Sequence, residues 1–229
     1  MDIILAVVKN IAVHERYAVV WAKHGIKAQR VDTMHEAIVK LNRGEEFFFV
    51  VISEDCIPDF MTQLPIMSDV SASPILVVTS SYTMKKKIAA MRNGAHLYVP
   101  LGEKTEDDVK VTFEVFSVQE RWSSLPLKRR PALVSGDIIL SLSRQVVLVE
   151  GTEVFLKNKE FEVLRFLMIN AGRFLSSEQI LCAVWGDGYI GEFNVLWQVI
   201  KRIRKSLSEA SPGKEYIVHK RDVGYKFIS

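Results

Sequence analysis

The first half of the chain alternates short apolar runs with amphipathic stretches. Continuous apolar runs predict strands buried on both faces at residues 3–8, 48–52 and 75–79, and a shorter strand at 97–99. Between these runs, apolar residues at helical spacing predict helices at 13–21, 37–41, 58–67 and 84–92, with a last helix beginning at Thr105. Repeated strand–helix units predict a mainly parallel sheet covered by helices on both faces.

The second half has a different pattern. Strand-like segments at 134–156 (DIILSL, QVVLVE and EVFL) predict a small antiparallel sheet. Three helices are predicted next. The first spans 160–169, the second begins after a capping box formed by Ser176 and Gln179, and the third spans 192–207. A hairpin-like tail, YIVHKRDVGYKF, ends this half. The segment SSLPLKRRP at 123–131 has the prolines and serines of a linker, so we expect domains at 1–122 and 132–229.

Composition narrows the classes of protein. The 229 residues are 48% apolar and 25% charged, which suits two packed domains. No apolar run approaches the roughly 18 residues of a membrane helix, and the first residues have neither a basic start nor a cleavage site. Cys56 and Cys182 are far apart and lack metal-ligand spacing. We therefore expect a cytoplasmic protein with no membrane association, metal or cofactor.

Charge is distributed unevenly along the chain. Residues 1–125 have 14 basic and 16 acidic side chains, a net charge of −2, whereas residues 126–229 have 16 basic and 11 acidic side chains, a net charge of +5. In the helix at 192–207, apolar residues lie on one side, and basic residues lie on the other. This distribution indicates that the second half meets a polyanion, although a solvated amphipathic helix would show the same pattern.

The motifs VVKN, VVISEDCIP, VVTSS and GAHLYVPLG, in this order, resemble the receiver domain of bacterial response regulators over residues 1–122. The resemblance implies a flavodoxin-like (βα)5 fold of the α/β class. It also identifies a set of functional positions: metal ligands at Lys9 and Asn10, the phosphoacceptor at Glu54, the switch residues at Thr79 and Tyr98, and the family's lysine at Leu101.

Four of these positions depart from the family in their chemistry. Mg²⁺ prefers carboxylate ligands, and the Lys9 ammonium would repel it. We therefore expect a receiver that has lost phosphorylation. Lys9 is expected to lie between Glu54 and Asp55 in place of the metal, and the alternative is a Lys9 side chain that points to solvent. Asp55 is a rival phosphoacceptor, but a neighbouring residue on a strand should point to the opposite face.

The motifs KEFEVLRFLMINAGRFLSSEQIL, VWG, VIKRIRKSL and RDVGYKF resemble the winged helix-turn-helix effector domain of the OmpR/PhoB family. This α+β fold implies binding to double-stranded DNA through the third helix. The resemblance implies DNA contacts at Trp185, Lys201, Arg202, Arg204 and Arg221, and Gln198 lies one turn from Arg202 on the outer face. For Arg204 the alternative is an ion pair with an acidic neighbour. Trp197 can contact DNA or pack against the loop after Trp185, and we favour the loop because a large ring gains most where it is dry.

Apolar residues surround the predicted last helix of the receiver. They exceed what one buried face absorbs, so we expect a homodimer interface that includes Val111, Val115 and Val118, with a wider core contact as the alternative. The sequence predicts a transcription regulator, not an enzyme, that binds DNA independently of phosphorylation and has RNA polymerase as a further partner. The alternative is an adaptor whose receiver binds an unknown ligand or protein.

Overall fold

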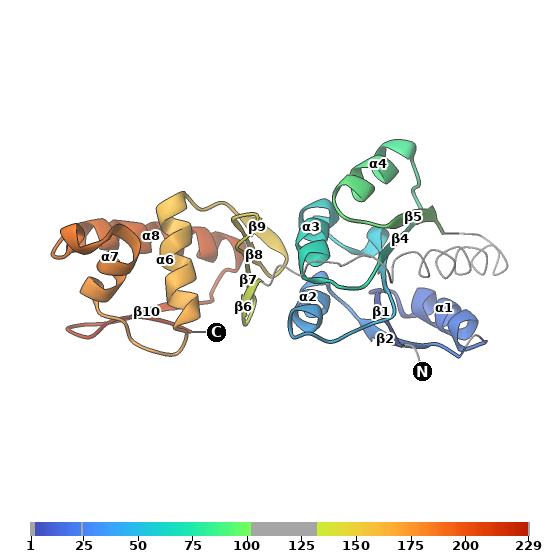
Figure 1. Cartoon of the computed structure of the whole chain (residues 1–229), viewed down its shortest axis with the longest axis horizontal. Helices are drawn as coiled ribbons and strands as arrows, with labels where there is room; N and C mark the ends of the chain where they lie inside the picture. Colours follow the sequence, from blue (N-terminus) through green and yellow to red (C-terminus); the bar gives the residue numbers. More distant parts are fainter. Residues whose placement is uncertain (1–2, 24, 102–131, 229) are drawn as a thin grey trace. The chain divides into compact units, whose positions relative to one another are not determined.

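The computed structural model describes residues 3–23, 25–101 and 132–228 (Figure 1). The chain divides into two compact units, Met1–Pro131 and Ala132–Ser229, which we describe separately. The predicted linker at 123–131, the predicted last helix of the receiver and its three valines lie outside the described residues. In the part of the chain that is described, no helix has the length and apolar character needed to cross a bilayer.

The first unit is a parallel five-stranded sheet in the order β2-β1-β3-β4-β5. Its strands are β1 (Ile3–Val7), β2 (Lys27–Val31), β3 (Val50–Ser53), β4 (Ile75–Thr79) and β5 (Leu97–Pro100). Its helices are α1 (Ile11–Lys23), α2 (Met34–Asn42), α3 (Phe60–Val70) and α4 (Met84–Arg92), with a 3-10 turn, η1, at Glu54–Cys56. The predicted α/β class is confirmed. This strand order brings the carboxyl ends of β1, β3, β4 and β5 to one edge.

Burial explains which strands the pattern predicts. All residues of β3 and β4 are buried, so they appear in the sequence as unbroken apolar runs. The edge strand β2 was missed because its residues, KAQRV, are mostly polar and only partly buried. The helix that precedes β3 starts as predicted, since Thr33 Oγ1 accepts a hydrogen bond from the Glu36 backbone N–H at 3.2 Å.

The second unit joins a four-stranded antiparallel sheet to three helices and a hairpin. The sheet contains β6 (Leu133–Ser135), β7 (Ile138–Ser141), β8 (Val146–Val149) and β9 (Thr152–Val154). The remaining elements are α6 (Asn158–Ile169), α7 (Ser177–Trp185), the 3-10 turn η2 (Asp187–Tyr189), α8 (Phe193–Ala210), β10 (Ile217–Lys220) and β11 (Gly224–Phe227). The winged-helix prediction is confirmed, and β6 is an additional strand that the pattern did not show.

The hairpin of β10 and β11, called the wing here, is fixed to the connection between α6 and α7. Leu175 and Tyr225 exchange backbone hydrogen bonds of 2.8 and 2.9 Å. Gly224 has φ +127°, and a Cβ at this position would lie 1.9 Å from the Leu175 carbonyl oxygen. Only glycine lets the two backbones approach this closely. The contact positions the wing beside α8.

Candidate nucleic-acid interface and receiver pocket

One side of α8 packs into the core of the second unit, and the other is exposed. The buried side consists of Leu196, Val199, Ile200, Ile203 and Leu207. The exposed side carries Trp197, Gln198, Lys201, Arg202 and Lys205. A three-to-four-residue spacing puts each set on one helical face. The structure therefore brings three of the predicted DNA contacts, Gln198, Lys201 and Arg202, onto the exposed surface of a single helix, together with Trp197 and Lys205.

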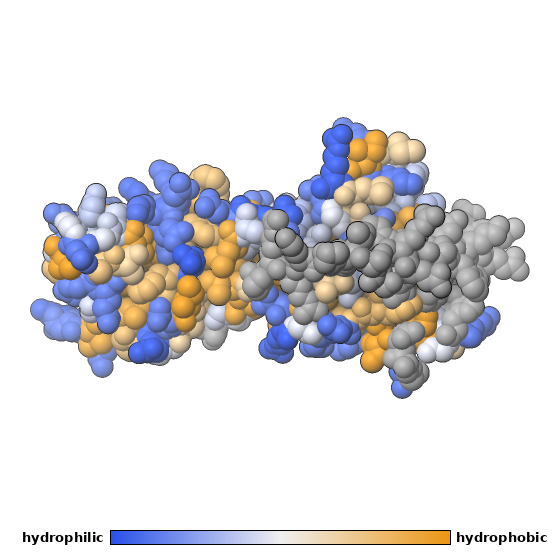
Figure 2. All heavy atoms as spheres, in the orientation of Figure 1, coloured by the Kyte–Doolittle hydropathy of each residue, from blue (hydrophilic) through white to orange (hydrophobic). Residues whose placement is uncertain are grey.

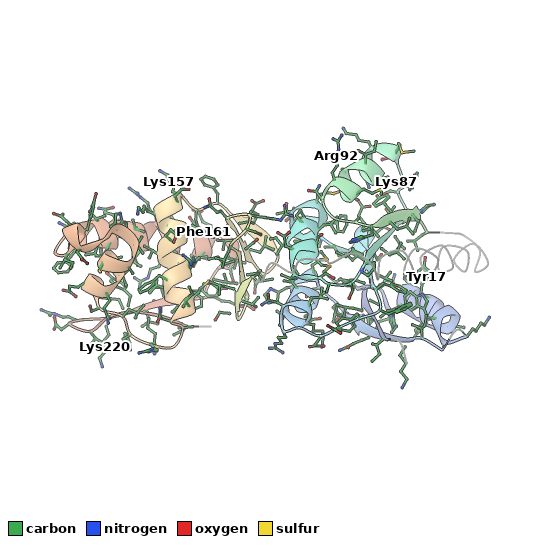
Figure 3. The ribbon with its side chains drawn as sticks, viewed as in Figure 1. Tyr17, Lys87, Arg92, Lys157, Phe161 and Lys220 are labelled. Carbon is green, nitrogen blue, oxygen red and sulfur yellow. The ribbon has the colours of Figure 1, made fainter. Side chains whose placement is uncertain are left out.

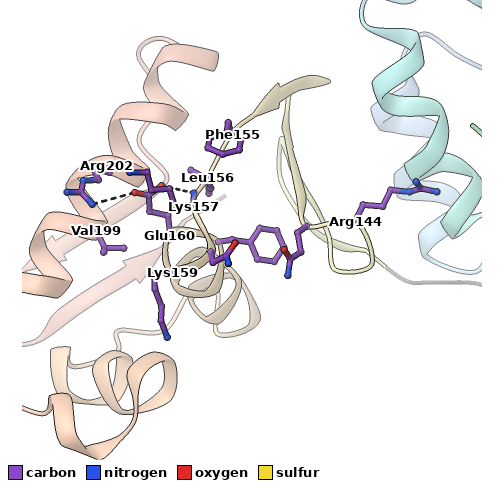
Figure 4. Close-up of a pocket in the computed structure, with 11 residues that line it drawn as sticks. Arg144, Phe155, Leu156, Lys157, Lys159, Glu160, Val199 and Arg202 are labelled. Carbon is purple, nitrogen blue, oxygen red and sulfur yellow. Dashed lines mark hydrogen bonds and ion pairs between the residues drawn. The ribbon is translucent and has the colours of Figure 1, made fainter.

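Arg202 lies on the side of α8 that faces α6. Its side chain is 58% exposed, and its guanidinium lies 3.9 Å from the carboxylate of the buried Glu160 (Figure 4). The other carboxylate oxygen of Glu160 accepts a hydrogen bond from the Lys157 backbone N–H at 2.9 Å and caps α6. Since the ion pair is long and its guanidinium is largely exposed, Arg202 can exchange this contact for a ligand at little cost.

Arg204 connects α8 to the wing. Its Nε and one terminal nitrogen donate hydrogen bonds of 3.1 and 2.7 Å to the Ile217 carbonyl oxygen, and Glu215 lies 3.8 Å away. The guanidinium therefore holds β10 against α8. Sequence reasoning missed this contact because the spacing of residues does not reveal which strand carbonyl faces the helix.

Trp197 and Lys201 lie on the side of α8 that faces the wing. The Lys201 ammonium lies 5.1 Å from the centroid of the Trp197 ring, a cation–π contact. Trp197 also lines a cavity together with His219 and Tyr225 of the wing. The sequence favoured packing of Trp197 on the loop after Trp185, whereas the contacts found here are with Lys201 and the wing side.

The wing ends in a tight turn that exposes Arg221. Its side chain is 93% exposed, and its guanidinium pairs with the Asp222 carboxylate at 3.7 Å. Asp222 has φ +61°, a conformation that favours glycine. Lys220 projects from the same end of the unit (Figure 3). An ion pair this exposed contributes little, so the guanidinium is available to a ligand.

Trp185 is half-buried at the end of α7. The Lys159 ammonium lies 5.3 Å from its ring centroid and donates a 2.6 Å hydrogen bond to the Val184 carbonyl oxygen. Tyr189 of η2 packs at a tilt against the ring, with centroids 6.5 Å apart. These neighbours fix the indole at the surface of the domain. Lys159 is a further cation of this surface that the sequence pattern did not single out.

In the receiver, both carboxylates of η1 are engaged by residues from the neighbouring strand ends and from the first turn of α4. The Tyr98 hydroxyl donates a short hydrogen bond to Glu54, and the Lys86 ammonium lies 3.3 Å from the same carboxylate. Asp55 accepts hydrogen bonds from Thr79 Oγ1 at 3.1 Å and from the Ser80 backbone N–H at 2.7 Å. Burial of Tyr98, together with its hydrogen bond to Glu54, raises the pKa of its hydroxyl well above its usual range.

Two predictions about this pocket are wrong. Lys9 is exposed, and no ion pair within 4 Å joins it to Glu54 or Asp55, all three being described residues. Lys86 supplies the cation instead, because α4 begins beside the pocket whereas β1 ends before Lys9. Asp55 does not point to the opposite face, because the chain leaves strand geometry at Ser53 and turns into η1.

The other two substituted positions have local structural roles. The Asn10 side-chain oxygen accepts a hydrogen bond from the Ala12 backbone N–H at 3.0 Å, at the start of α1. Leu101 is half-buried and packs against the core cluster of the sheet, and its backbone N–H donates to the Thr79 carbonyl oxygen at 2.7 Å.

The residues of this edge do not fit a divalent cation. Lys9 brings a positive charge, Asn10 is used in a cap, and both oxygens of Asp55 already accept hydrogen bonds. Over the described ranges, no group of three or more His, Cys, Asp or Glu side chains could hold a metal ion. An exposed ammonium at the family's ligand position would repel Mg²⁺ rather than bind it.

Comparison with known proteins finds one matching family and several similar sequences. Residues 151–227 match the family described as "Transcriptional regulatory protein, C terminal". The probable transcriptional regulatory protein TcrX of Mycobacterium tuberculosis is 30% identical over 181 residues, which cover 77% of this chain and 74% of TcrX. The sensory transduction protein RegX3 of the same organism is 29% identical over 157 residues, 68% of each chain.

Solved structures that match the chain include the Thermotoga maritima response regulator DrrB, an OmpR/PhoB homolog. It is 24% identical, and the match covers all of both chains with a TM-score of 0.43. The DNA-binding domain of Klebsiella pneumoniae RstA, solved in complex with the RstA box, is 25% identical over 42% of this chain and 96% of that domain, with a TM-score of 0.39. The chain combines a parallel receiver sheet, a winged-helix domain and a sequence similar to TcrX over most of its length. It is therefore a member of the OmpR/PhoB family of response regulators, and hence a DNA-binding transcriptional regulator rather than an enzyme.

Proposed function

We propose that the chain is a sequence-specific transcription regulator whose receiver works without aspartyl phosphorylation and assembles as a homodimer. The observation that carries the proposal is the state of Glu54. Its carboxylate already has a cation, Lys86, and a hydrogen-bond donor, Tyr98. A divalent cation and a phosphoryl group would have to displace both partners before they could reach it.

The chemistry of phosphoryl transfer supports this reasoning. Transfer to a carboxylate relies on a metal ion that neutralises the phosphate oxygens. Here the fixed positive charge belongs to Lys86, which also donates a 2.7 Å hydrogen bond to the Ser81 hydroxyl. Tyr98 is fully buried with its hydroxyl on Glu54, so the switch aromatic is held inward by a carboxylate of the protein itself. The Glu54 carboxylate therefore supplies the negative charge of this pocket without a phosphoryl group.

The test combines two measurements on the full chain. Untreated protein is titrated with genomic DNA fragments in a mobility-shift assay, and protein treated with Mg²⁺ and acetyl phosphate is analysed by mass spectrometry and titrated again. We expect specific binding by the untreated protein, no phosphate adduct on Glu54 or Asp55, and the same affinity after treatment. A phosphate adduct that tightens DNA binding would refute phosphorylation independence.

For the interface with double-stranded DNA, we propose a division of roles along α8 and the wing. Gln198 and Arg202 read bases in the major groove, where Arg pairs with guanine and Gln with adenine. Lys201 and Trp185 contact phosphates, and Arg221 enters the minor groove at the exposed tip of the wing. Arg204, predicted as a phosphate contact, also positions β10 through the Ile217 carbonyl.

The homodimer proposal rests on apolar surface in the receiver. Met84, Ile88 and Met91 recur at helical spacing along α4, and each is about half exposed. Figure 2 shows apolar side chains beside hydrophilic ones over this helix, and Lys87 and Arg92 project from it as well (Figure 3). Such a patch usually marks an interface. It supports a receiver-mediated dimer, for which Val111, Val115 and Val118 are the interface residues predicted from the sequence.

Light scattering at micromolar concentration tests the dimer. We expect a dimer that becomes a monomer when Val111 and Val115 are replaced by Glu. The same α4 patch also favours a second candidate, an adaptor whose receiver binds another protein to control DNA binding. An unaltered chain that is monomeric at every concentration would favour the adaptor. Both proposals include RNA polymerase as a further partner and a cytoplasmic location for the protein.

A further inference from the structure

A cavity with aromatic walls lies between α8 and the wing, on the face that we propose for DNA. It has a volume of about 290 Å³ and is lined by Trp197, Ile200, Lys201, Arg204, His219 and Tyr225. The rings of His219 and Tyr225 pack against each other with centroids 4.7 Å apart. Three ring systems and an isoleucine make most of this surface apolar, although it lies on the basic side of the domain.

The two cations of the cavity are already engaged. The Arg204 guanidinium donates two hydrogen bonds to the Ile217 carbonyl oxygen. The Lys201 ammonium lies over the Trp197 ring. The walls of the cavity therefore offer mainly aromatic and aliphatic surface, which suits an apolar group.

Trp197 is an exposed ring of this cavity, on the face that we propose for DNA. Half of its surface is exposed, and it precedes Gln198 on α8 by one residue, so the ring lies on the wing side of the reading face. The major groove presents hydrogen-bonding groups and one apolar group, the C5-methyl of thymine. An indole ring has one hydrogen-bond donor, its Nε1–H, and the rest of its surface is apolar and can remove a methyl group from water.

We propose that Trp197, supported by this cavity, reads the 5-methyl group of a thymine on the wing side of the major groove. The inference rests on the proposed DNA-binding function and adds a base preference to it. Burial of one methyl or methylene group is worth about 0.8 kcal/mol, which corresponds to a three- to five-fold change in affinity. The contribution is small per contact but specific, because no other base carries a methyl at this edge.

The experiment uses uracil, which differs from thymine only by this methyl. A duplex is selected from a random library with the full chain, and each thymine is then replaced singly by uracil and titrated by fluorescence anisotropy. We expect one or two replacements to weaken binding of the unaltered protein about three- to five-fold. Trp197→Ala should bind the thymine and uracil duplexes equally well. Phe155→Ala, which removes an aromatic side chain that is 84% exposed elsewhere in the domain, should keep the full discrimination.

Several outcomes overturn the inference. One is an unaltered protein that binds every uracil duplex as tightly as the thymine duplex, a result that needs no variant. Another is a Trp197→Ala protein that weakens on all duplexes alike and still discriminates uracil, since the ring would then contact sugar or phosphate. In both cases DNA binding itself stands. Failure to select any duplex would overturn the proposed function and this inference with it.

Discussion

Glu54 and Tyr98 should be energetically coupled, and a double-mutant cycle measures that coupling. Tyr98 is fully buried, and its hydroxyl donates to a carboxylate, so the bond is charge-assisted. Hydrogen bonds to charged groups contribute about 1.5–3 kcal/mol to stability. Glu54 keeps the Lys86 ion pair when the hydroxyl is removed, which limits the loss. We therefore expect Tyr98→Phe to lower the unfolding free energy of the receiver by about 1.5–2.5 kcal/mol.

The cycle compares Tyr98→Phe, Glu54→Ala and the double variant by urea denaturation, with tyrosine and tryptophan fluorescence as probes. The interaction energy should be about 1–2 kcal/mol, because the two side chains are in direct contact. Tyr82→Phe is the matched control. It makes the same chemical change on a more exposed neighbour whose ring lies 5.8 Å from Tyr98. A coupling below roughly 0.5 kcal/mol, or one no larger than that of the control, would refute the reasoning.

The same hydroxyl predicts a pH dependence. Its folded-state pKa lies above the ordinary tyrosine value of about 10. A group with a raised pKa stabilises the fold fully below its unfolded pKa, and this contribution is lost as the pH rises above that value. The stability difference between the unaltered receiver and Tyr98→Phe should therefore be constant from pH 7 to about 9 and shrink above about pH 10. A difference that grows with alkaline pH would contradict the assignment.

Two further predictions concern the second unit. Arg202→Ala should lower the binding free energy for the selected duplex by about 1–3 kcal/mol and relax specificity at one position. Lys201→Ala should weaken binding to specific and scrambled duplexes alike and lower the magnitude of the salt slope by about one. Equal effects of both variants, titrated at several salt concentrations, would contradict this division of roles. Gly224→Ala should destabilise the domain by more than about 3 kcal/mol in thermal unfolding, because its Cβ would lie 1.9 Å from the Leu175 carbonyl oxygen. Gly213→Ala, at φ +84° but in open space, should cost only about 1–2 kcal/mol, and similar losses for both glycines would count against the clash.

The sequence determined the features that depend on neighbouring residues. The buried strands β3 and β4 and the helix α4 follow from local apolar patterns, and Ile75–Thr79 and Met84–Arg92 were predicted to the residue. The capping box of Ser176 and Gln179 forms as predicted, because its hydrogen bonds of 2.8 and 3.2 Å join atoms three residues apart.

Only the tertiary structure decided which distant side chains meet. The sequence pointed to Lys9 as the cation of the receiver pocket, but Lys86 occupies that role because the start of α4 lies beside η1. Arg204 reads in the sequence as one more basic residue of a helix face, yet its guanidinium is bound to a carbonyl thirteen positions away along the chain. Periodicity gives the face of an element on which a residue lies. The partner is set by how elements pack against each other, and that packing depends on the whole core.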